Sequence, residues 1–340
     1  MSSTPVTETK ILESLNHTII PTLSPTSCKD ATCIFFAVAN VIILVTGVAG
    51  NGLVIWIAGF KMKKSVLSTW YLSLAVSDFL FCCTLPFGIV YAVKKEWLFG
   101  SFMCKIRYFV MFINMYSSIF LLAIISVDRC VVVMFPVWAQ NKRTVRKATV
   151  MVILAWIMSA TLSVPMAIFH NQKEKLVDNH MKRFCSRNYI NYQNQLAVVA
   201  SRFVFGCLIP FLIIFICYVV IIRKLKSNQM MISKKPFKIM TVLIVTFLIC
   251  WLPFHIFSFL EMKIFSRFIG FGKVFGVTLA SANSILNPIL YTFMGKDFKK
   301  QCYAILSKIE NALQEDEGHD TVQVIAFTTS EERRLPTTVQ

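Results

Sequence analysis

The chain has 340 residues, of which 56% are hydrophobic, and its mean hydropathy is +0.64. Soluble domains are about 45–50% apolar, so this composition excludes a large soluble domain beside the apolar segments. The net charge of +18 is typical of the basic loops of a membrane protein, and no basic arm with interleaved aromatic residues indicates nucleic-acid binding.

Residues 1–33 are polar and rich in Ser, Thr and Pro, which predicts a flexible N-terminal segment. This segment has no apolar core of the kind found in a cleaved signal peptide, so we expect the first apolar span to direct insertion. Asn16-His17-Thr18 is a glycosylation sequon. It predicts glycosylation of Asn16 if this end of the chain is extracellular.

Seven apolar stretches follow, and each is long enough for a helix that crosses a membrane. None shows the alternation of a membrane barrel strand. We therefore predict an all-α membrane protein with a bundle of seven transmembrane helices. The stretches are 34–58, 70–93, 102–135, 148–169, 196–222, 237–260 and 271–293.

Lysine and arginine in the connections predict the orientation of the bundle. The connections at 61–64, 142–147 and 223–238 are basic, which places them in the cytoplasm. The opposite side is basic too, so the bias is not extreme. With seven spans, the N-terminus is then extracellular and residues 294–340 are cytoplasmic, as expected for a multi-pass protein of the plasma membrane.

The segment after the seventh span has an apolar stripe, formed by Phe298, Cys302, Ile305 and Leu306, with lysines opposite. This pattern predicts an amphipathic eighth helix on the membrane surface, within a bundle region of 34–310. Cys302 is either a palmitoylation site or an ordinary packing cysteine.

The remaining segment, 311–340, is acidic and then rich in Thr and Ser, which predicts a cytoplasmic regulatory tail. Hydroxyls near acids suit the kinases of activated receptors, and several phosphates there would suit arrestin. The alternative is a solvated tail with no role. The predicted phosphorylation sites are Thr321, Thr328, Thr329 and Ser330.

Short motifs occur in order, one or two in each span. They are Gly50-Asn51-Gly52-Leu53-Val54, Leu74-Ala75-Val76-Ser77-Asp78, Asp128-Arg129-Cys130, Trp156, Pro210 with Tyr218, Cys250-Trp251-Leu252-Pro253 and Asn287-Pro288-Ile289-Leu290-Tyr291. In this combination the chain resembles a rhodopsin-type G-protein-coupled receptor over about residues 34–310.

Further stretches are similar to the chemoattractant branch of that family, which contains formyl-peptide and chemerin-type receptors. These stretches are Trp97-Leu98-Phe99-Gly100, 136–141, 234–238 and 293–298, and Cys130 also fits the branch. This chain differs from each of these two receptor types at one position. Chemerin-type receptors have an arginine where His170 stands, and formyl-peptide receptors have an aspartate where Phe112 stands.

The cysteines at the predicted outer side allow a disulfide. Cys104 opens the third span, and Cys185 lies in the long loop 171–194, in an oxidising compartment. The resemblance implies a bond between them, which would hold that loop over the mouth of the bundle. A local bond between Cys28 and Cys33 stays open.

Asp78 is a carboxylate at the middle of the second span, where it would be costly without partners. The resemblance favours an oxygen-lined sodium site here, and the alternative is a network of water molecules around a neutral Asp78. The other members would be Asn114, Ser118, Asn283, Ser284 and Asn287.

The family resemblance also implies a coupling surface for a G protein at the cytoplasmic end. Arg129 would pair with Asp128 in a closed state and contact the G protein in an open one. Ser233 replaces the acid that often completes an ionic lock, so tight basal silencing is not expected. Pro253 would act as the hinge of the sixth span. The residues implied in activation are Tyr218, Trp251, Tyr291 and the triad Ile119, Pro210 and Phe247, of which Ile119 and Phe247 could equally be ordinary core.

The predicted ligand pocket is cationic. It lacks the acid of an amine receptor, because Met111 and Phe112 stand there, and it has Ser281 in place of an opsin's lysine. Arg202 lies inside the fifth span and aligns with an arginine that chemoattractant receptors use for ligand carboxylates. Alternatively, Arg202 forms a structural ion pair with Glu261. The predicted ligand-binding residues are Arg202, Glu261, Lys273, Arg107, His170, Phe112 and Tyr91, with Arg187 adding positive potential.

Together these patterns predict a receptor and not an enzyme. Its ligand would be a peptide or lipid with an anionic group, and its partners an inhibitory-class G protein, arrestin, receptor kinases and membrane lipids. A transporter or channel would call for repeats or paired broken helices, which the sequence lacks. The third alternative is a scavenging receptor with weak coupling, against which the intact Arg129, Tyr218 and Tyr291 argue.

Overall fold

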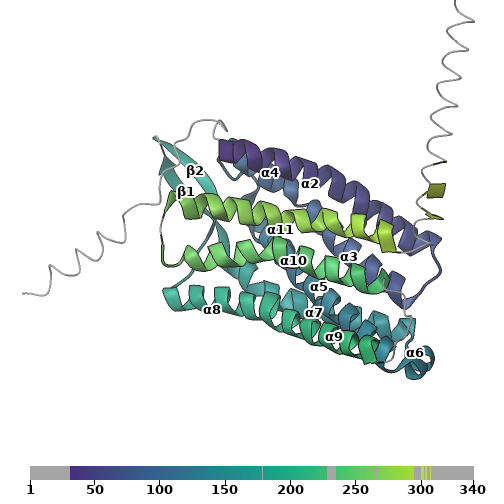
Figure 1. The fold of residues 1–340 in the computed structure, drawn as a ribbon. Coiled ribbons are helices and arrows are strands. Elements are labelled where there is room, and N and C mark those ends of the chain that lie inside the picture. Colours follow the sequence, from purple (N-terminus) through teal and green to yellow (C-terminus); the bar gives the residue numbers. More distant parts are fainter. Residues whose placement is uncertain are drawn as a thin grey trace, which may run out of the picture.

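The computed structural model describes residues 31–177, 179–227, 235–264 and 266–294, with single positions between 300 and 307. In this part of the chain, long helices lie side by side, with a two-stranded hairpin at one end and α6 at the other (Figure 1). We call these the hairpin end and the α6 end. The elements are α2 (Ala31–Trp56), η1 (Ile57–Lys61), α3 (Val66–Cys82), α4 (Leu85–Lys94), α5 (Gly100–Met134), α6 (Pro136–Lys142), α7 (Val145–Phe169), β1 (His170–Val177), β2 (His180–Arg187), α8 (Tyr192–Phe203), η2 (Val204–Leu208), α9 (Ile209–Ser227), α10 (Lys235–Leu260) and α11 (Arg267–Met294).

The prediction of seven spans is confirmed. Six stretches are long and apolar enough to cross a membrane, and the apolar part of α10, Ile244–Leu260, is the seventh. Large apolar side chains of α7 point away from the protein, including Leu154, Ile157 and Met158, all more than half exposed. In water such a face would be costly, whereas in lipid it is the expected surface.

Side-chain caps fix where several helices begin. Ser65 and Ser68 form a reciprocal capping box at the start of α3. Thr144 accepts a hydrogen bond from the backbone of Lys147 at the start of α7, and Asn191 caps α8 in the same way. The second predicted span is divided into α3 and α4, with Pro86 in the first turn of α4.

The fifth span is interrupted by the π-helical turn η2 directly before Pro210. The N–H of Ile209 bonds to the carbonyl of Val204, five residues earlier. Because Pro210 has no N–H, it cannot continue the regular ladder, and a wider turn accommodates the loss. The turn lies next to α5, where Gly206 is close to Met115: a Cβ at position 206 would be 2.7 Å from the Met115 methyl.

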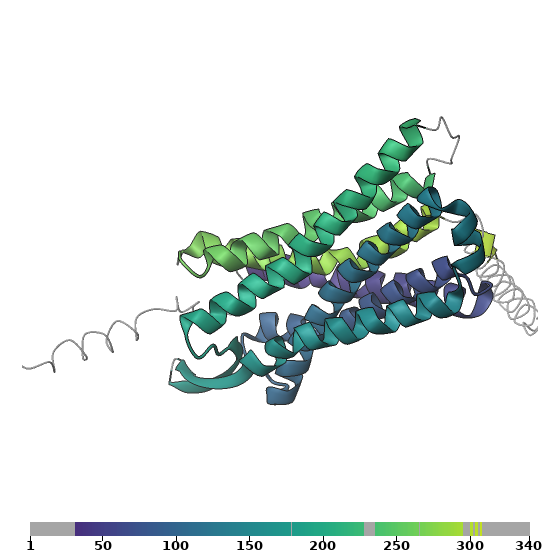
Figure 2. The ribbon, with the colours of Figure 1, turned by 90° about the horizontal axis from the view of Figure 1, so that it is seen from below.

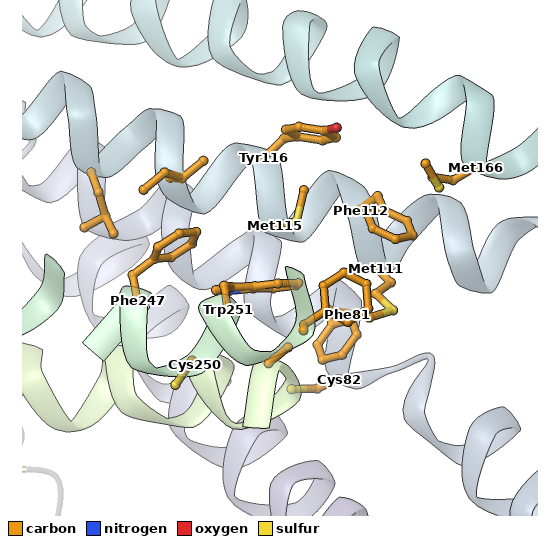
Figure 3. Packing of buried hydrophobic residues seen from close by; sticks show 14 of the residues in the cluster. Phe81, Cys82, Met111, Phe112, Met115, Tyr116, Met166, Phe247, Cys250 and Trp251 are labelled. Carbon is orange, nitrogen blue, oxygen red and sulfur yellow. The ribbon is translucent and has the colours of Figure 1, made fainter. Parts of the chain in front are cut away.

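The helix α5 lies at the centre of the bundle and packs against α3, α7 and α9. The largest buried cluster joins α5 to α10, and Figure 3 shows Phe247 and Trp251 directed from α10 toward Met115 and Phe112 of α5. On the other side of the bundle, the indole N–H of Trp156 donates to Ser73 at 2.9 Å, which fixes α7 to α3.

The hairpin replaces part of what the sequence predicted to be a loop. Strands β1 and β2 are antiparallel, with His170 opposite Arg187 and Gln172 opposite Cys185. Figure 2 shows both strands at one end of the bundle, while the helices run along its length. This register places Cys185 and Arg187, two residues apart, on the same face of β2.

Candidate functional site

A disulfide joins the hairpin to the start of α5. Cys104 and Cys185 are bonded, with their Cα atoms 5.7 Å apart, which confirms the predicted pair. Trp97 is fully buried beside this bond, and its indole N–H donates to the carbonyl of Gly100 at 2.7 Å. Its backbone N–H donates to the carbonyl of Arg183 at 2.8 Å. The hairpin is therefore held in place covalently and through hydrogen bonds.

Glu261 is the acidic centre of the hairpin end. It accepts from Arg187 of β2, with an Nη2–Oε2 distance of 2.9 Å, and from the ammonium of Lys273 on α11. Burial by itself would raise the pKa of Glu261, but Arg187 and then Lys273 hold it below its ordinary value. Glu261 thus pairs internally, with partners other than the one considered from the sequence, and ties the hairpin to α10 and α11.

His170 fills the space between the hairpin and α5. Its ring is 1% exposed and stacks on Tyr108, with centroids 3.6 Å apart. Its Nδ1 lies 2.7 Å from the carbonyl oxygen of Met166 and must donate, because a carbonyl only accepts. Burial, and then the positive charge of Arg187, lowers the pKa of His170 to about 3. It is therefore a neutral packing group at neutral pH.

Arg202 is a buried cation at the end of α8. It is 2% exposed, and its Cζ lies 5.3 Å from the ring centroid of Phe112 and 4.7 Å from that of Phe254. The rings contact its guanidinium, but Nε and Nη2 have no hydrogen-bond partner among the described residues. The alternative ion pair between Arg202 and Glu261 is absent from the described structure, in which Glu261 pairs with Arg187 and Lys273 instead.

The two unpartnered nitrogens of Arg202 are the pair that binds a carboxylate side-on. Arg143, at the other end of the molecule, shows the same arrangement with its acceptor in place. Its Nε and Nη2 donate to the two oxygens of Asp128 at 2.6 and 2.9 Å. Arg202 presents this fork from a buried position without an acceptor in the described part of the chain.

His255 was missed by the sequence analysis. It lies on α10, is 1% exposed, and neither ring nitrogen has a partner in the described ranges. Its ring packs edge-on against Phe203 and Phe254, each with a centroid distance of 5.7 Å. A histidine inside the apolar run of the sixth span was the available signal, since a polar side chain at that depth is costly.

The remaining predicted ligand-binding residues lie around this site in different surroundings. Phe112 is buried under Arg202, whereas Tyr91 packs edge-on against Trp97 at 5.5 Å, close to the disulfide. Arg107 lies against Gly88, where an added Cβ would be 2.4 Å from its Nη2. The structure therefore brings Arg202, Phe112 and His255 together and places Tyr91 in a separate cluster.

At the middle of the bundle, Asp78 is fully buried and accepts two amide hydrogen bonds. Asn114 donates to its Oδ1 at 2.8 Å and Asn287 to its Oδ2 at 2.7 Å. Among the predicted site residues, three buried oxygens have no hydrogen-bond partner in the described structure: Asn114 Oδ1, Ser118 Oγ and Ser284 Oγ. Asn283 is also buried. Such oxygens near a carboxylate fit a hard cation such as sodium.

At the α6 end, Asp128 is shared by two arginines. Arg129 approaches its Oδ2 to 3.2 Å, and Arg143, which the sequence analysis did not single out, binds both oxygens. Among the residues implied in activation, Ile119, Phe247 and Trp251 are buried, and the rings of Phe247 and Trp251 stack at 6.1 Å. Tyr218 lies on α9.

Several predicted positions lie outside the described residues. They are Asn16, Cys28, Ser233, Cys302, Thr321, Thr328, Thr329 and Ser330, together with most of the predicted eighth helix and the side chain of Tyr291.

Comparison with known proteins agrees with this architecture. Residues 50–291 match the family described as 7 transmembrane receptor (rhodopsin family). The chain is 41% identical to human chemerin-like receptor 1, over 89% of this chain and 86% of that protein. It is 38% identical to mouse formyl peptide receptor-related sequence 1 and 36% identical to human N-formyl peptide receptor 2, in each case over 80% of this chain and 83% of the relative. The chain belongs to the rhodopsin family of seven-transmembrane receptors and is similar to chemoattractant receptors within it.

Proposed function

We propose that this receptor binds a ligand with an anionic group at Arg202 and signals through an inhibitory-class G protein and arrestin. The hairpin end is then extracellular and the α6 end cytoplasmic, in line with the basic connections at the α6 end. The observation that carries the proposal is the side-on fork of Arg202, which is buried without an acceptor in the described structure.

A buried guanidinium without an acceptor is unfavourable, because it has lost its water and gained no ion pair. Cation–π contacts with Phe112 and Phe254 offset only part of the free-energy cost of burying the guanidinium. A ligand carboxylate would supply two charge-assisted hydrogen bonds to this buried group. Glu261 does not serve as this acceptor in the described structure, where it pairs with Arg187 and Lys273 while Nε and Nη2 of Arg202 have no partner.

The relatives support a ligand of this class. One is named a chemerin-like receptor and two are named formyl peptide receptors, so peptides are ligands of the latter by name. Formyl-peptide receptors are expected to have an aspartate at the position of Phe112. In this chain the Phe112 ring lies under the Arg202 guanidinium. A carboxylate beside Arg202 would therefore have to come from the ligand and not from this position of α5.

Sodium is part of the proposal as an allosteric ion. Asp78, Asn114 and Ser118 would hold it, with Asn283, Asn287 and Ser284 as further oxygens. The ion would neutralise the buried carboxylate of Asp78 in one conformer of the bundle. Sodium would then favour that conformer by its difference in affinity between the two.

At the cytoplasmic end we infer that Arg129 contacts the G protein after it leaves Asp128. The contact between them is a single 3.2 Å approach, whereas Arg143 binds Asp128 through two hydrogen bonds. Asp128 is therefore already engaged when Arg129 is released. Receptor kinases and arrestin would act on the tail after Gln314, which lies outside the described residues.

The binding proposal can be tested with purified receptor in lipid nanodiscs. The probes are undecanoate and its uncharged analogue undecanamide, and the readout is the dissociation constant. Undecanoate should bind more tightly than undecanamide. The variant Arg202→Met should weaken undecanoate by about 10- to 150-fold, the equivalent of 1.5–3 kcal/mol for hydrogen bonds to a charged group.

Two variants control this test. Arg202→Lys keeps the charge but lacks the fork, and should recover only part of the affinity. Arg183→Met removes a cation at the same end that pairs with Glu96 at 3.1 Å, and should leave undecanoate binding within about threefold of the wild type. Unchanged binding in Arg202→Met would refute the anchor.

The coupling proposal is tested in cells. Loss of the ligand's inhibition of cAMP formation after pertussis toxin treatment would support inhibitory-class coupling, and an unaltered response would contradict it.

A further inference from the structure

His255 is a second buried polar group beside Arg202. Both of its ring nitrogens lack a partner within the described ranges, and the side chain is 1% exposed. A neutral imidazole carries one donor nitrogen and one acceptor nitrogen, and burying both without partners is unfavourable. The ring packs against Phe203 and Phe254, which hold it edge-on but offer no hydrogen-bond acceptor or donor in their side chains.

Arg202 and His255 pack against the same ring, that of Phe254. The centroid of this ring is 4.7 Å from the Arg202 Cζ and 5.7 Å from the His255 centroid. Phe203, which follows Arg202 in the chain, packs edge-on against His255 at 5.7 Å. The site thus offers a cationic fork from α8 and a donor–acceptor ring from α10.

We propose that His255 recognises the amide next to the ligand's carboxylate, so that the site selects N-acyl amino acids and the free C-termini of peptides over simple fatty acids. This inference rests on the proposed function of Arg202. In a C-terminal residue the amide N–H is on the same carbon as the carboxylate. With the carboxylate on Arg202, this amide is next to the anchored group and can form one hydrogen bond with His255, either from its N–H to the acceptor nitrogen or from the donor nitrogen to its carbonyl.

The selectivity follows because a plain alkyl chain cannot form a hydrogen bond with His255. A fatty acid satisfies Arg202 but places methylene groups against His255, so that its ring nitrogens stay unpaired in the complex. Sites built to hydrogen-bond a polar ligand group discriminate strongly against an analogue that lacks the group, for this reason. An apolar pocket at His255 would show no such preference.

The test compares two acids of the same chain length, N-octanoylglycine and undecanoate, which differ by one amide. In nanodiscs, wild-type receptor should bind N-octanoylglycine about fivefold to tenfold more tightly, as expected for about one net hydrogen bond. His255→Phe keeps an aromatic ring against Phe203 and Phe254, and should remove this preference while leaving undecanoate within about twofold. His255→Gln retains a donor and an acceptor, and should keep part of the preference.

Arg202→Met separates this inference from the proposal on which it rests. This variant should weaken the binding of both acids by a similar factor. Equal binding of the two acids to the wild type, or an unchanged preference in His255→Phe, would overturn the role of His255 and leave the Arg202 anchor standing. If Arg202→Met binds both acids as tightly as the wild type does, or if neither acid binds the wild type, the Arg202 anchor fails and the inference about His255 fails with it.

Discussion

Acid should loosen the hairpin through His170. The ordinary pKa of this side chain is 6.5, and in the folded protein it is lowered to about 3 by burial and then by Arg187. Between these values the opened hairpin takes up a proton that the closed hairpin does not. By linkage, the closed state is therefore destabilised as the pH falls from about 6.5 toward 3, and the effect fades as the pH rises above 6.5.

The magnitude follows from the ordinary pKa, because the folded value lies far below the range tested. At pH 5.5 the opened state gains about 1.4 kcal/mol from protonation, which is a tenfold increase in the opening constant over pH 7.5. Glu261 adds nothing in this range, because its carboxyl pKa is held below 4.5 and it stays ionised. Hydrogen exchange of the β1 and β2 amides, corrected for the intrinsic effect of pH, measures the opening constant.

The variant His170→Phe retains a ring against Tyr108 but does not titrate. It loses the hydrogen bond to Met166 at every pH, so its hairpin should open more readily than that of the wild type, but by a factor that does not grow on acidification. His180→Asn is the matched control, because His180 is exposed at the hairpin turn and its removal should keep the acid response. An acid response of equal size in His170→Phe would refute the reasoning.

Three further predictions concern other parts of the receptor. Cys185→Ser should free the hairpin and lower the surface level of the receptor, and non-reducing mass spectrometry that finds a free thiol on Cys104 of the wild type would contradict this. Arg143→Ala should lower basal G-protein signalling, because Asp128 then becomes available to Arg129; a rise in basal cAMP inhibition would refute it, and Arg143→Lys should have a smaller effect. Truncation after Gln314 should preserve G-protein signalling and slow internalisation, whereas internalisation at the full-length rate would assign arrestin binding to the cytoplasmic loops.

The spans could be predicted from the sequence because a membrane leaves a helix few alternatives. Every backbone polar group must be paired within the segment, so an apolar stretch of sufficient length is a helix. The Cys104–Cys185 bond was implied by the family resemblance, and it is present. The hairpin was not predicted, since 170–187 is largely polar and basic and has little of the β-branched composition that signals a strand. Its strands are instead fixed by pairing and by the disulfide.

The ion pairs were harder to predict, because they depend on distances between distant segments. Arg187, Arg202 and Lys273 are all basic residues near the same end, and the sequence alone could not say which of them Glu261 binds. In the fold, β2 brings Arg187 to Glu261 and α11 brings Lys273, while Arg202 packs on the ring of Phe254. Arg143 was likewise noted as one of several loop cations, and its proximity to Asp128 follows only from the position of α6.

The same contacts suggest how an anion at Arg202 could act on the rest of the bundle. Arg202 belongs to α8 but rests on Phe254 of α10, which packs edge-on against Trp251 at 5.9 Å. Trp251 stacks on Phe247 at 6.1 Å, one turn nearer the α6 end. Pro253 lies between Phe254 and Trp251 and cannot donate a backbone hydrogen bond, so α10 can bend there at low cost. A ligand that draws Arg202 away from Phe254 would thus act on α10 directly above its weakest point, and would bias the conformers that differ below it.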